Sequence, residues 1–406
     1  MVFFKVLLVL SFFYTACFSR TEVEQKLTET ASHFTSNFKN KPYSDVDVYD
    51  LIRTVKKNKK GYRFYLLKYE KGKWGVFPPN KPYIGLNKVN EVYTIDYMLT
   101  WLNQNVTDSI KEGMMVVVYS LELIHGFLYM SEEEQKEIVK CAKNVPILIT
   151  CTHPNLDWSY EAVLVPDPWV LGDGYRNTYK QLIEHPFPAL KDRKPVVYFR
   201  GAFNSPYSVP FTMRNALRSD RLNLGLLSFI YPWIDVGYTQ YPWVNDTALS
   251  KQFVEWFSSH PLSRKGAKSE NFITHGQNKY LISIDGFGAA WTRLPYILCT
   301  GSVLLARADC HQYFYKLLQK GETHYSIKSG LINLEEAYKD LEEHPKLAEK
   351  IARQGKEFAK NYLNPNAIDF YLKTVIYQLN EAYKPNESIW SKLKLQLAKL
   401  RFEWGI

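Results

Sequence analysis

The clearest pattern of apolar and polar positions lies in the second half of the chain. Tyr280 to Ile284 is a short apolar run that predicts a buried strand, and Asp285 to Gly288 interrupts it. A second apolar run, Leu294 to Leu298, predicts a helix, and after Gly301 the residues Ser302 to Leu305 predict another strand. This order of strand, glycine loop, helix, glycine and strand is typical of a parallel βαβ unit.

A proline restricts where the helix of this unit begins. Pro295 is tolerated in a first helical turn, where its missing N–H costs nothing, so we expect the helix to begin near Trp291 or Thr292. Three residues before it then keep their backbone N–H groups free: Gly288, Ala289 and Ala290. A helix N-terminus favours an anion, and Arg293 lies beside it. The pattern predicts either a cradle for a nucleotide diphosphate or an ordinary βαβ turn with a solvated arginine.

The first half of the chain carries its own strands. Tyr62 to Phe77 alternates around the sequence Lys-Gly-Lys at residues 71–73, which predicts a hairpin. Met114 to Ser120 and Val145 to Thr150 predict buried strands, and Glu132 to Ala142 predicts a helix between them. Both halves therefore predict α/β structure.

The alternation of strands and helices continues towards the C-terminus. Pro195 to Phe199 predicts a strand that ends at Arg200, at the edge where open α/β sheets bind ligands. Asn333 predicts a helix N-cap, and Pro345 predicts the start of the next helix. Residues 388–402 have one apolar face and predict a last helix, which either packs on the protein or lies on a membrane surface.

We predict four parts in the chain. Residues 1–19 have one lysine, an apolar run and a small-residue end, which is typical of a secretory signal. An uncleaved membrane anchor is the alternative for this segment. Residues 20–188 form a first lobe, residues 189–375 a second lobe, and residues 376–406 a C-terminal helix that packs back on the first lobe. Glycosylation sequons begin at Asn105, Asn245 and Asn386, as expected for passage through the secretory pathway.

The net charge of +10 is consistent with binding of anionic ligands such as nucleotide sugars or with a surface that faces a membrane. It is equally consistent with a basic surface that is simply solvated. Nucleic acid is not predicted as a partner, because no basic block is interleaved with RNA-binding motifs. Removal of the signal would leave four cysteines, Cys141, Cys151, Cys299 and Cys310. They allow at most two disulfides, whose pairing the sequence does not determine, and their spacing is not that of a metal site.

Motifs in the second half match a known family in order and spacing. They are Gly288 to Arg293 (GAAWTR), Cys299, Gly301-Ser302, Phe314-Tyr315, His324 to Lys328 (HYSIK), Tyr198 to Gly201 (YFRG) and Asn204 to Pro206. In these residues the chain resembles glycosyltransferase family 90, which includes the Rumi-type protein O-glucosyltransferases and the fungal capsule xylosyltransferases. The match extends over about Val196 to Leu363 and is weak before Val145.

The resemblance implies a fold and a donor site. The fold is GT-B-like, with two Rossmann-like lobes facing a cleft, the donor on the second lobe and the acceptor on the first. Arg200 and Arg293 would bind the donor diphosphate, because a guanidinium gives bidentate, always-charged hydrogen bonds. Ser205 and the N–H groups of residues 288–290 would be further donors to phosphate or ribose.

The resemblance also implies an activity. The chain would be an inverting O-glycosyltransferase that moves glucose or xylose from a UDP-sugar to a hydroxyl of a secretory-pathway protein or glycan. It would act in the lumen of the endoplasmic reticulum or Golgi, or be secreted. One alternative is a transferase that modifies polysaccharide or lipopolysaccharide. Another is a non-catalytic lumenal module that binds carbohydrate or protein.

We predict that the activity needs no metal. Asp45 and Asp47 form a DxD pattern, which holds Mn²⁺ or Mg²⁺ in many glycosyltransferases when it ends a buried strand. Here it precedes an amphipathic segment, Val48 to Val55, so we interpret it as the acidic start of a helix.

The residue at the position of the general base differs from the one in the family pattern. An inverting transfer needs a carboxylate within hydrogen-bond reach of the acceptor hydroxyl. In Rumi-type enzymes a first-lobe strand ends in an Arg-Asp pair whose aspartate is the base, and the strand Met114 to Ser120 places Leu121 at that position. Glu122, the next residue, is our first candidate, and Asp157, after the strand Val145 to Thr150, is the second.

We expect Glu122→Gln to lower turnover by about 10²-fold or more with little change in donor affinity, because only proton transfer is lost. Steady-state rates beside those of Asp157→Asn provide the measurement. A normal rate for Glu122→Gln with an inactive Asp157→Asn would transfer the role to Asp157, and two fully active variants would exclude both carboxylates.

Overall fold

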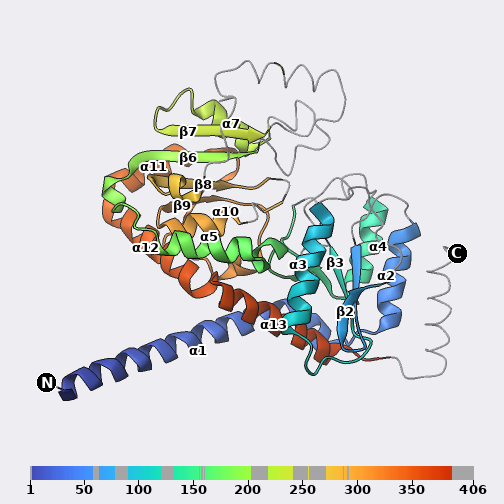
Figure 1. The fold of residues 1–406 in the computed structure, drawn as a ribbon. Helices are drawn as coiled ribbons and strands as arrows, with labels where there is room; N and C mark the ends of the chain where they lie inside the picture. The colour runs from blue at the N-terminus through green and yellow to red at the C-terminus, as the bar shows by residue number, and fades with distance from the viewer. Residues whose placement is uncertain are drawn as a thin grey trace.

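A computed structural model describes most of the chain. It covers residues 2–57, 64–77, 90–119, 132–154, 156, 159, 161–202, 218–240, 255, 271–286, 288–289 and 292–385. Within these ranges the chain forms two α/β lobes side by side, each built on a five-stranded sheet (Figure 1). The predicted α/β fold of two lobes is confirmed. No helix in these ranges combines the length and apolar character needed to cross a bilayer.

The sheet of the first lobe is mixed, with strand order β2-β1-β3-β4-β5. Its strands are β1 (Phe64–Glu70), β2 (Lys73–Val76), β3 (Met115–Tyr119), β4 (Ile147–Ile149) and β5 (Val163–Leu164). The β1–β2 and β1–β3 pairs are antiparallel, whereas β3, β4 and β5 run parallel. Lys71 and Gly72 both have positive φ, at 54° and 76°. This is the backbone of the tight turns that match the twist of paired strands, so the predicted hairpin is confirmed.

Helices α2 (Asp45–Lys57), α3 (Asn90–Asn105) and α4 (Glu132–Ala142) belong to the first lobe (Figure 1). The interpretation of the DxD pattern is confirmed, because Asp45 and Asp47 lie in the first turn of α2. The Asp47 carboxylate accepts hydrogen bonds from the N–H and the hydroxyl of Ser44, each at 2.8 Å. These acids therefore stabilise a helix N-terminus.

The sheet of the second lobe is parallel throughout, with strand order β10-β9-β8-β6-β7. Its strands are β6 (Lys194–Ala202), β7 (Ile234–Gln240), β8 (Asn278–Ile284), β9 (Val303–Arg307) and β10 (Tyr325–Ser326). Every residue of β8 is buried, as expected for the central strand. Helix α10 (Arg293–Thr300) joins β8 to β9 and ends at Gly301 in the left-handed conformation, with φ 67°. The predicted βαβ unit is confirmed.

The remaining helices, apart from α1 (Val2–Asn40) and α13 (Pro365–Ala382), come after β5 in the chain. They are η3 (Pro168–Leu171), α5 (Asp173–Glu184), η4 (Leu190–Asp192), α7 (Asp220–Leu227), α9 (Phe272–His275), η5 (Tyr313–Leu317), η6 (Ser329–Leu331), α11 (Leu334–Glu343) and α12 (Pro345–Tyr362). Among them, α5, α7, α11 and α12 lie around the second sheet (Figure 1). Pro345 begins α12 as predicted. Asn333 is the N-cap residue of α11, as predicted, but its side chain makes no capping hydrogen bond. Its amide bonds the N–H of Lys328 at 2.7 Å and the carbonyl of Ser326 at 3.1 Å, so it holds the preceding loop instead.

Two long helices connect the lobes. Helix α1 (Val2–Asn40) lies along α13 (Pro365–Ala382) (Figure 1). The hydroxyl of Thr35 on α1 donates to Gln378 on α13 at 2.6 Å. Near the same C-terminal end, α13 meets the first lobe, where Asn380 accepts the N–H of Lys111 at 2.8 Å and donates to the carbonyl of Ser109 at 3.0 Å. The chain thus returns to the first lobe after the second is complete. Residues 2–19 of the predicted signal fall within α1, and the helix predicted at 388–402 lies outside the described residues.

We expect Asn380→Ala to lower the free energy of unfolding by about 1 kcal/mol, because it removes two partly buried hydrogen bonds, to the N–H of Lys111 and the carbonyl of Ser109. Urea denaturation provides the measurement. Asn361→Ala, on the exposed surface of α12, is the matched control. Equal stability of Asn380→Ala and the wild type would contradict the assigned hydrogen bonds.

Candidate functional site

Arginine side chains from different elements gather at the carboxyl edge of the second sheet. Arg200, near the end of β6, is buried and forms an ion pair with Asp235 of β7 at 2.9 Å. Its guanidinium also lies 4.1 Å from the centre of the Tyr198 ring. Arg200 is therefore at the predicted edge, with part of its charge already balanced by a carboxylate.

Arg293 reaches the same edge from the first residue of α10. Its guanidinium lies 4.7 Å from the centre of the Phe199 ring. A Cβ at Gly201 would lie 2.5 Å from Nη2 of Arg293, so a side chain at this position would displace the guanidinium. Burial lowers the pKa of Arg293 to about 10, and the side chain stays charged at neutral pH. In the described part of the chain, no carboxylate forms an ion pair with it.

Arg221 of α7 is a third arginine at this edge, which the sequence analysis missed. It donates to the carbonyl of Ile284 at 2.8 Å and to the carbonyl of Ala202 at 2.6 Å, and so joins the ends of β8 and β6. Burial, together with the charge of Arg293, lowers the pKa of Arg221 to about 9. No motif marks Arg221, since its acceptors are carbonyls from distant strands.

A histidine lies beside the arginines. His275 of α9 packs edge-on against the Tyr198 ring, with centroids 5.2 Å apart. Burial, together with the charges of Arg293 and Arg200, lowers the pKa of His275 to about 3, so the imidazole is neutral. Its Nε2 is buried and makes no hydrogen bond within the described residues. The site therefore adds a neutral polar atom to the positive charges.

Asp285 follows β8 and ties it to the segment after β9. Its Oδ2 accepts the N–H groups of Asp309 at 2.6 Å and Cys310 at 2.8 Å. Burial raises the pKa of Asp285 to about 7, although these N–H donors and the Arg221 charge oppose the shift. The carboxyl group therefore titrates in the physiological range while it holds two strand ends in register.

The loop predicted to cradle a diphosphate touches the first lobe. The N–H of Ala289 donates to Sγ of Cys151 at 3.4 Å, and a Cβ on Gly288 would lie 3.4 Å from the same sulfur. A thiol is a weak acceptor, so a phosphate oxygen could replace it at this N–H. Ala290 lies outside the described residues. Within the part described, no cluster of three or more acidic, histidine or cysteine side chains is arranged to hold a metal ion.

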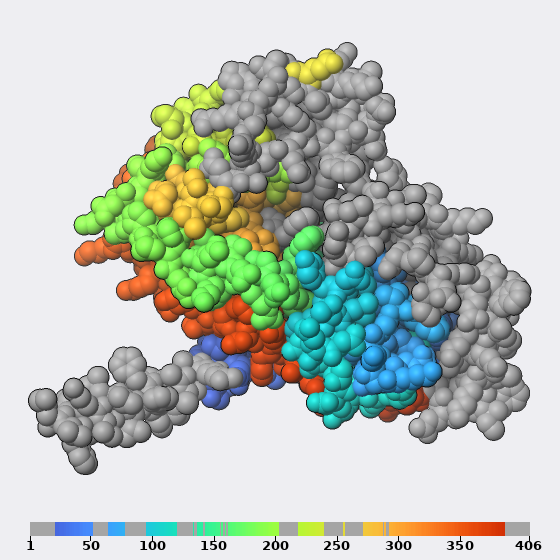
Figure 2. Space-filling view, viewed as in Figure 1, coloured from blue at the N-terminus to red at the C-terminus, as the bar shows by residue number. Residues whose placement is uncertain are grey.

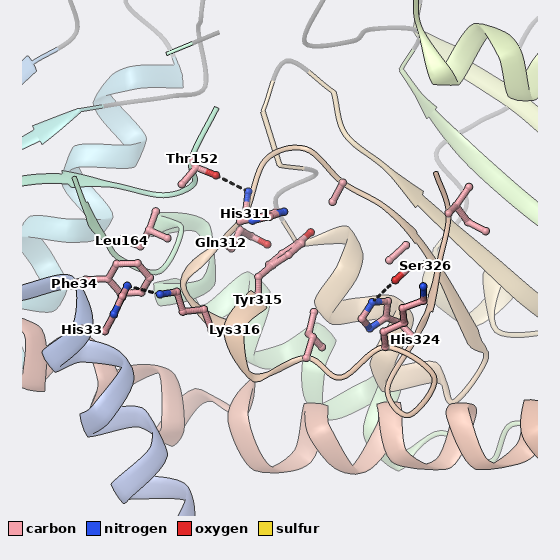
Figure 3. Close-up of a pocket in the computed structure, with 15 residues that line it drawn as sticks. His33, Phe34, Thr152, Leu164, His311, Gln312, Tyr315, Lys316, His324 and Ser326 are labelled. Atoms are coloured by element: carbon pink, nitrogen blue, oxygen red, sulfur yellow. Dashed lines mark hydrogen bonds between the residues drawn. The ribbon is translucent and has the colours of Figure 1, made fainter. Parts of the chain in front are cut away.

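A cavity of about 610 Å³ lies between the lobes and α1 (Figure 3). Thr152, after β4, accepts the N–H of His311 at 2.9 Å on one side of it. On the other side, Nε2 of His324 lies 3.1 Å from the Ser326 hydroxyl. Burial, with the charge of Lys320, lowers the pKa of His324 to about 4, so this imidazole is also neutral. The lining of the cavity therefore combines polar groups that can hydrogen-bond a ligand with apolar side chains such as Leu164.

The two lobes are in contact beside this site. The space-filling view shows the second lobe, green to orange, against the first lobe in cyan and blue (Figure 2). The N–H of Thr152, after β4 of the first lobe, donates to the carbonyl of His311, after β9 of the second lobe, at 2.9 Å.

Four of the predicted site residues lie at or beside this edge: Arg200, Gly288, Ala289 and Arg293. Four others lie outside the described residues: Glu122, Asp157, Ser205 and Ala290. Of the sequon asparagines, Asn105 ends α3 and donates to the carbonyl of Trp101 at 2.9 Å, while Asn245 and Asn386 lie outside the described residues.

The raised pKa of Asp285 predicts how the stability of the protein depends on pH. The folded carboxyl keeps its proton to about pH 7, whereas an unfolded aspartate loses it near about pH 4. The folded state binds more protons in this window, so its stability falls as pH rises through it. We expect the unfolding free energy of the wild type, relative to Asp285→Asn, to fall by about 1 kcal/mol per pH unit across the window.

Denaturation of both proteins between pH 4 and pH 8 (about the limits of the window) measures this difference. Asp192→Asn, at an exposed position, is the control and should follow the wild type at every pH. A constant difference between wild type and Asp285→Asn would show that the folded carboxyl is already ionised at the acid end.

Comparison with known proteins places the chain in a family. The model of "Glycosyl transferase family 90" matches residues 175–389, which is more than half of the chain. Human protein O-glucosyltransferase 3 is 28% identical over 173 residues, which cover 42% of this chain and 31% of the relative. Human protein O-glucosyltransferase 1 is 23% identical over 191 residues, which cover 47% of this chain and 43% of the relative. The chain thus spans less than half of the length of these relatives.

Among solved structures, HepE of Anabaena in complex with UDP-glucose is similar, with a TM-score of 0.41 and 9% identity over 72% of this chain and 77% of that one. At that TM-score the likeness adds nothing to the two-sheet architecture already described. The family match includes the arginine edge, the glycine loop and the βαβ unit that carries them. The chain belongs to glycosyl transferase family 90.

Proposed function

We propose that the chain is an inverting O-glycosyltransferase that uses a UDP-sugar as donor. The observation that carries this proposal is Arg293, a guanidinium at the carboxyl edge of the second sheet with no ion-pair partner among the described residues. A buried cation without a nearby carboxylate favours an anionic ligand, because the ligand then offsets part of the cost of desolvation. Membership of family 90 supports the same activity.

The three arginines suit a diphosphate leaving group. Negative charge grows on the diphosphate as the glycosidic bond breaks, and fixed positive charges in a low-dielectric site stabilise it most at that point. Arg221 already donates to two carbonyls and Arg200 is paired with Asp235, so we assign the main contact to Arg293. Arg200 and Arg221 then raise the positive electrostatic potential at the site and hold the strand ends in place.

The names of the relatives support a choice of donor sugar and acceptor. Their names describe them as protein O-glucosyltransferases, which supports glucose as the sugar and a protein hydroxyl as the acceptor. Xylose as the sugar and a glycan as the acceptor are the variants that family resemblance also allows. We assign donor binding to residues 189–375, acceptor binding to residues 20–188, and the activity to the secretory pathway lumen or outside the cell.

Two other functions use the same edge. A transferase acting on polysaccharide or lipopolysaccharide would need the same donor site and a different acceptor surface. A non-catalytic lumenal module would bind carbohydrate or protein without turnover. Release of UDP that depends on an added acceptor excludes the module, and comparison of protein and glycan acceptors separates the two transferases.

We expect Arg293→Ala to lower turnover by about 10²-fold or more while the fold is kept, because it removes a contact that strengthens as the leaving group gains charge. UDP release and a UDP thermal shift measure catalysis and binding separately. Arg353→Ala, at an exposed position of α12, is the matched control.

Gly201→Ala tests the same assignment without removing the charge. The new Cβ would lie 2.5 Å from Nη2 of Arg293 and must displace the guanidinium. Turnover should therefore fall in Gly201→Ala, whereas Gly174→Ala, whose Cβ would meet nothing within 4 Å, should keep the normal rate. A wild-type rate in Arg293→Ala would contradict the donor site.

A further inference from the structure

Two cysteines from different lobes meet beside the arginine edge. Cys151 follows β4 of the first sheet, and Cys310 follows β9 of the second. Both side chains are buried, with exposed fractions of 3% and 0%. The thiol of Cys310 forms a hydrogen bond with that of Cys151. Both are free thiols in this structure.

The backbone on both sides holds these thiols together. The N–H of Thr152 donates to the carbonyl of His311 at 2.9 Å, and the N–H of His311 donates to the Thr152 hydroxyl at 2.9 Å (Figure 3). The N–H of Cys310 also donates to the Asp285 carboxylate at 2.8 Å. These hydrogen bonds between and within the lobes hold the backbone of the two cysteines close together.

We propose that Cys151 and Cys310 form a disulfide that joins the two lobes when the protein folds in an oxidising medium. The oxidant is a low-molecular-weight disulfide such as glutathione disulfide. The thiolate of Cys151 attacks one of its sulfur atoms and expels one glutathione thiolate, which leaves a mixed disulfide. The thiolate of Cys310 then attacks Sγ of Cys151 and expels the second. Two protein thiols lose two protons and two electrons, and glutathione disulfide becomes two glutathione thiols.

The bond would act on the molecule in two ways. It closes a long loop between two sheets, which restricts the unfolded chain and stabilises the folded one. It also fixes the sulfur that accepts the N–H of Ala289, and so anchors the glycine loop of the second lobe to the first lobe. Neither effect depends on the proposed function.

Cys299 provides a matched control within the chain. It is fully buried on α10, like the other two thiols. Its described surroundings are the Lys356 ammonium and tyrosine rings, including those of Tyr175 and Tyr179. Cys299→Ser therefore removes a buried thiol without touching the proposed bond.

The experiment is a peptide map of the full chain. The protein is folded in a glutathione redox buffer, its free thiols are alkylated, and it is digested without reduction for mass spectrometry. We expect a peptide pair joined through Cys151 and Cys310 that disappears after dithiothreitol. Reduction should also lower the melting temperature by about 5 °C. Cys299→Ser should keep the linked peptides and the shift, and Cys310→Ser should lose both.

Alkylation of both Cys151 and Cys310 in the folded, oxidised protein would overturn the proposal. A bond from Cys310 to Cys141 or Cys299 would overturn it as well. If Cys310→Ser does not fold, the wild-type map decides alone, because it needs no variant.

Discussion

The candidate site depends on burying guanidinium groups whose charges are met mainly by neutral partners. Arg221 donates to the carbonyls of Ile284 and Ala202, and Arg293 lies over the Phe199 ring. Carbonyl dipoles and ring faces stabilise a cation without cancelling its charge. The electrostatic potential at this edge of the sheet therefore stays positive and favours the binding of an anion. This arrangement costs stability in the free protein, as the lowered pKa values of both arginines show, and binding of an anion offsets that cost.

The position of the lobes depends on contacts at two levels. Far from the site, α13 leaves the second lobe and is tied by Asn380 to the segment before β3 of the first lobe. Next to the site, Thr152 and His311 exchange two hydrogen bonds between the lobes. The hydrophobic core around α1, α13 and the first sheet also includes Leu281 and Leu304 of the second sheet. The lobes therefore share part of their core, and a site built between them is supported from both sides.

Much of the fold could be predicted because its signals are local. The Lys-Gly turn at residues 71–72 specifies the hairpin through backbone conformation, and the apolar runs of β8 and β9 identify buried strands. Arg293 was found because a motif carries it. Arg221 and the roles of Asp285 and Cys151 were missed, because their partners are far away in the sequence and only the tertiary fold brings them together. The N-cap position of Asn333 was predicted correctly, but its side-chain amide bonds the preceding loop and does not cap α11.

Comparison of two arginines separates a structural role from a functional one in this lobe. Arg307 ends β9 and pairs with Asp220 at 2.6 Å and Asp309 at 2.8 Å, and these carboxylates raise its pKa although burial opposes them. Its charge is used within the protein. Arg293 has a comparable place at a neighbouring strand end, but burial lowers its pKa and no described carboxylate pairs with it. The two side chains have the same chemistry and differ only in their partners. An anionic substrate would supply the negatively charged partner that Arg293 lacks among the described residues.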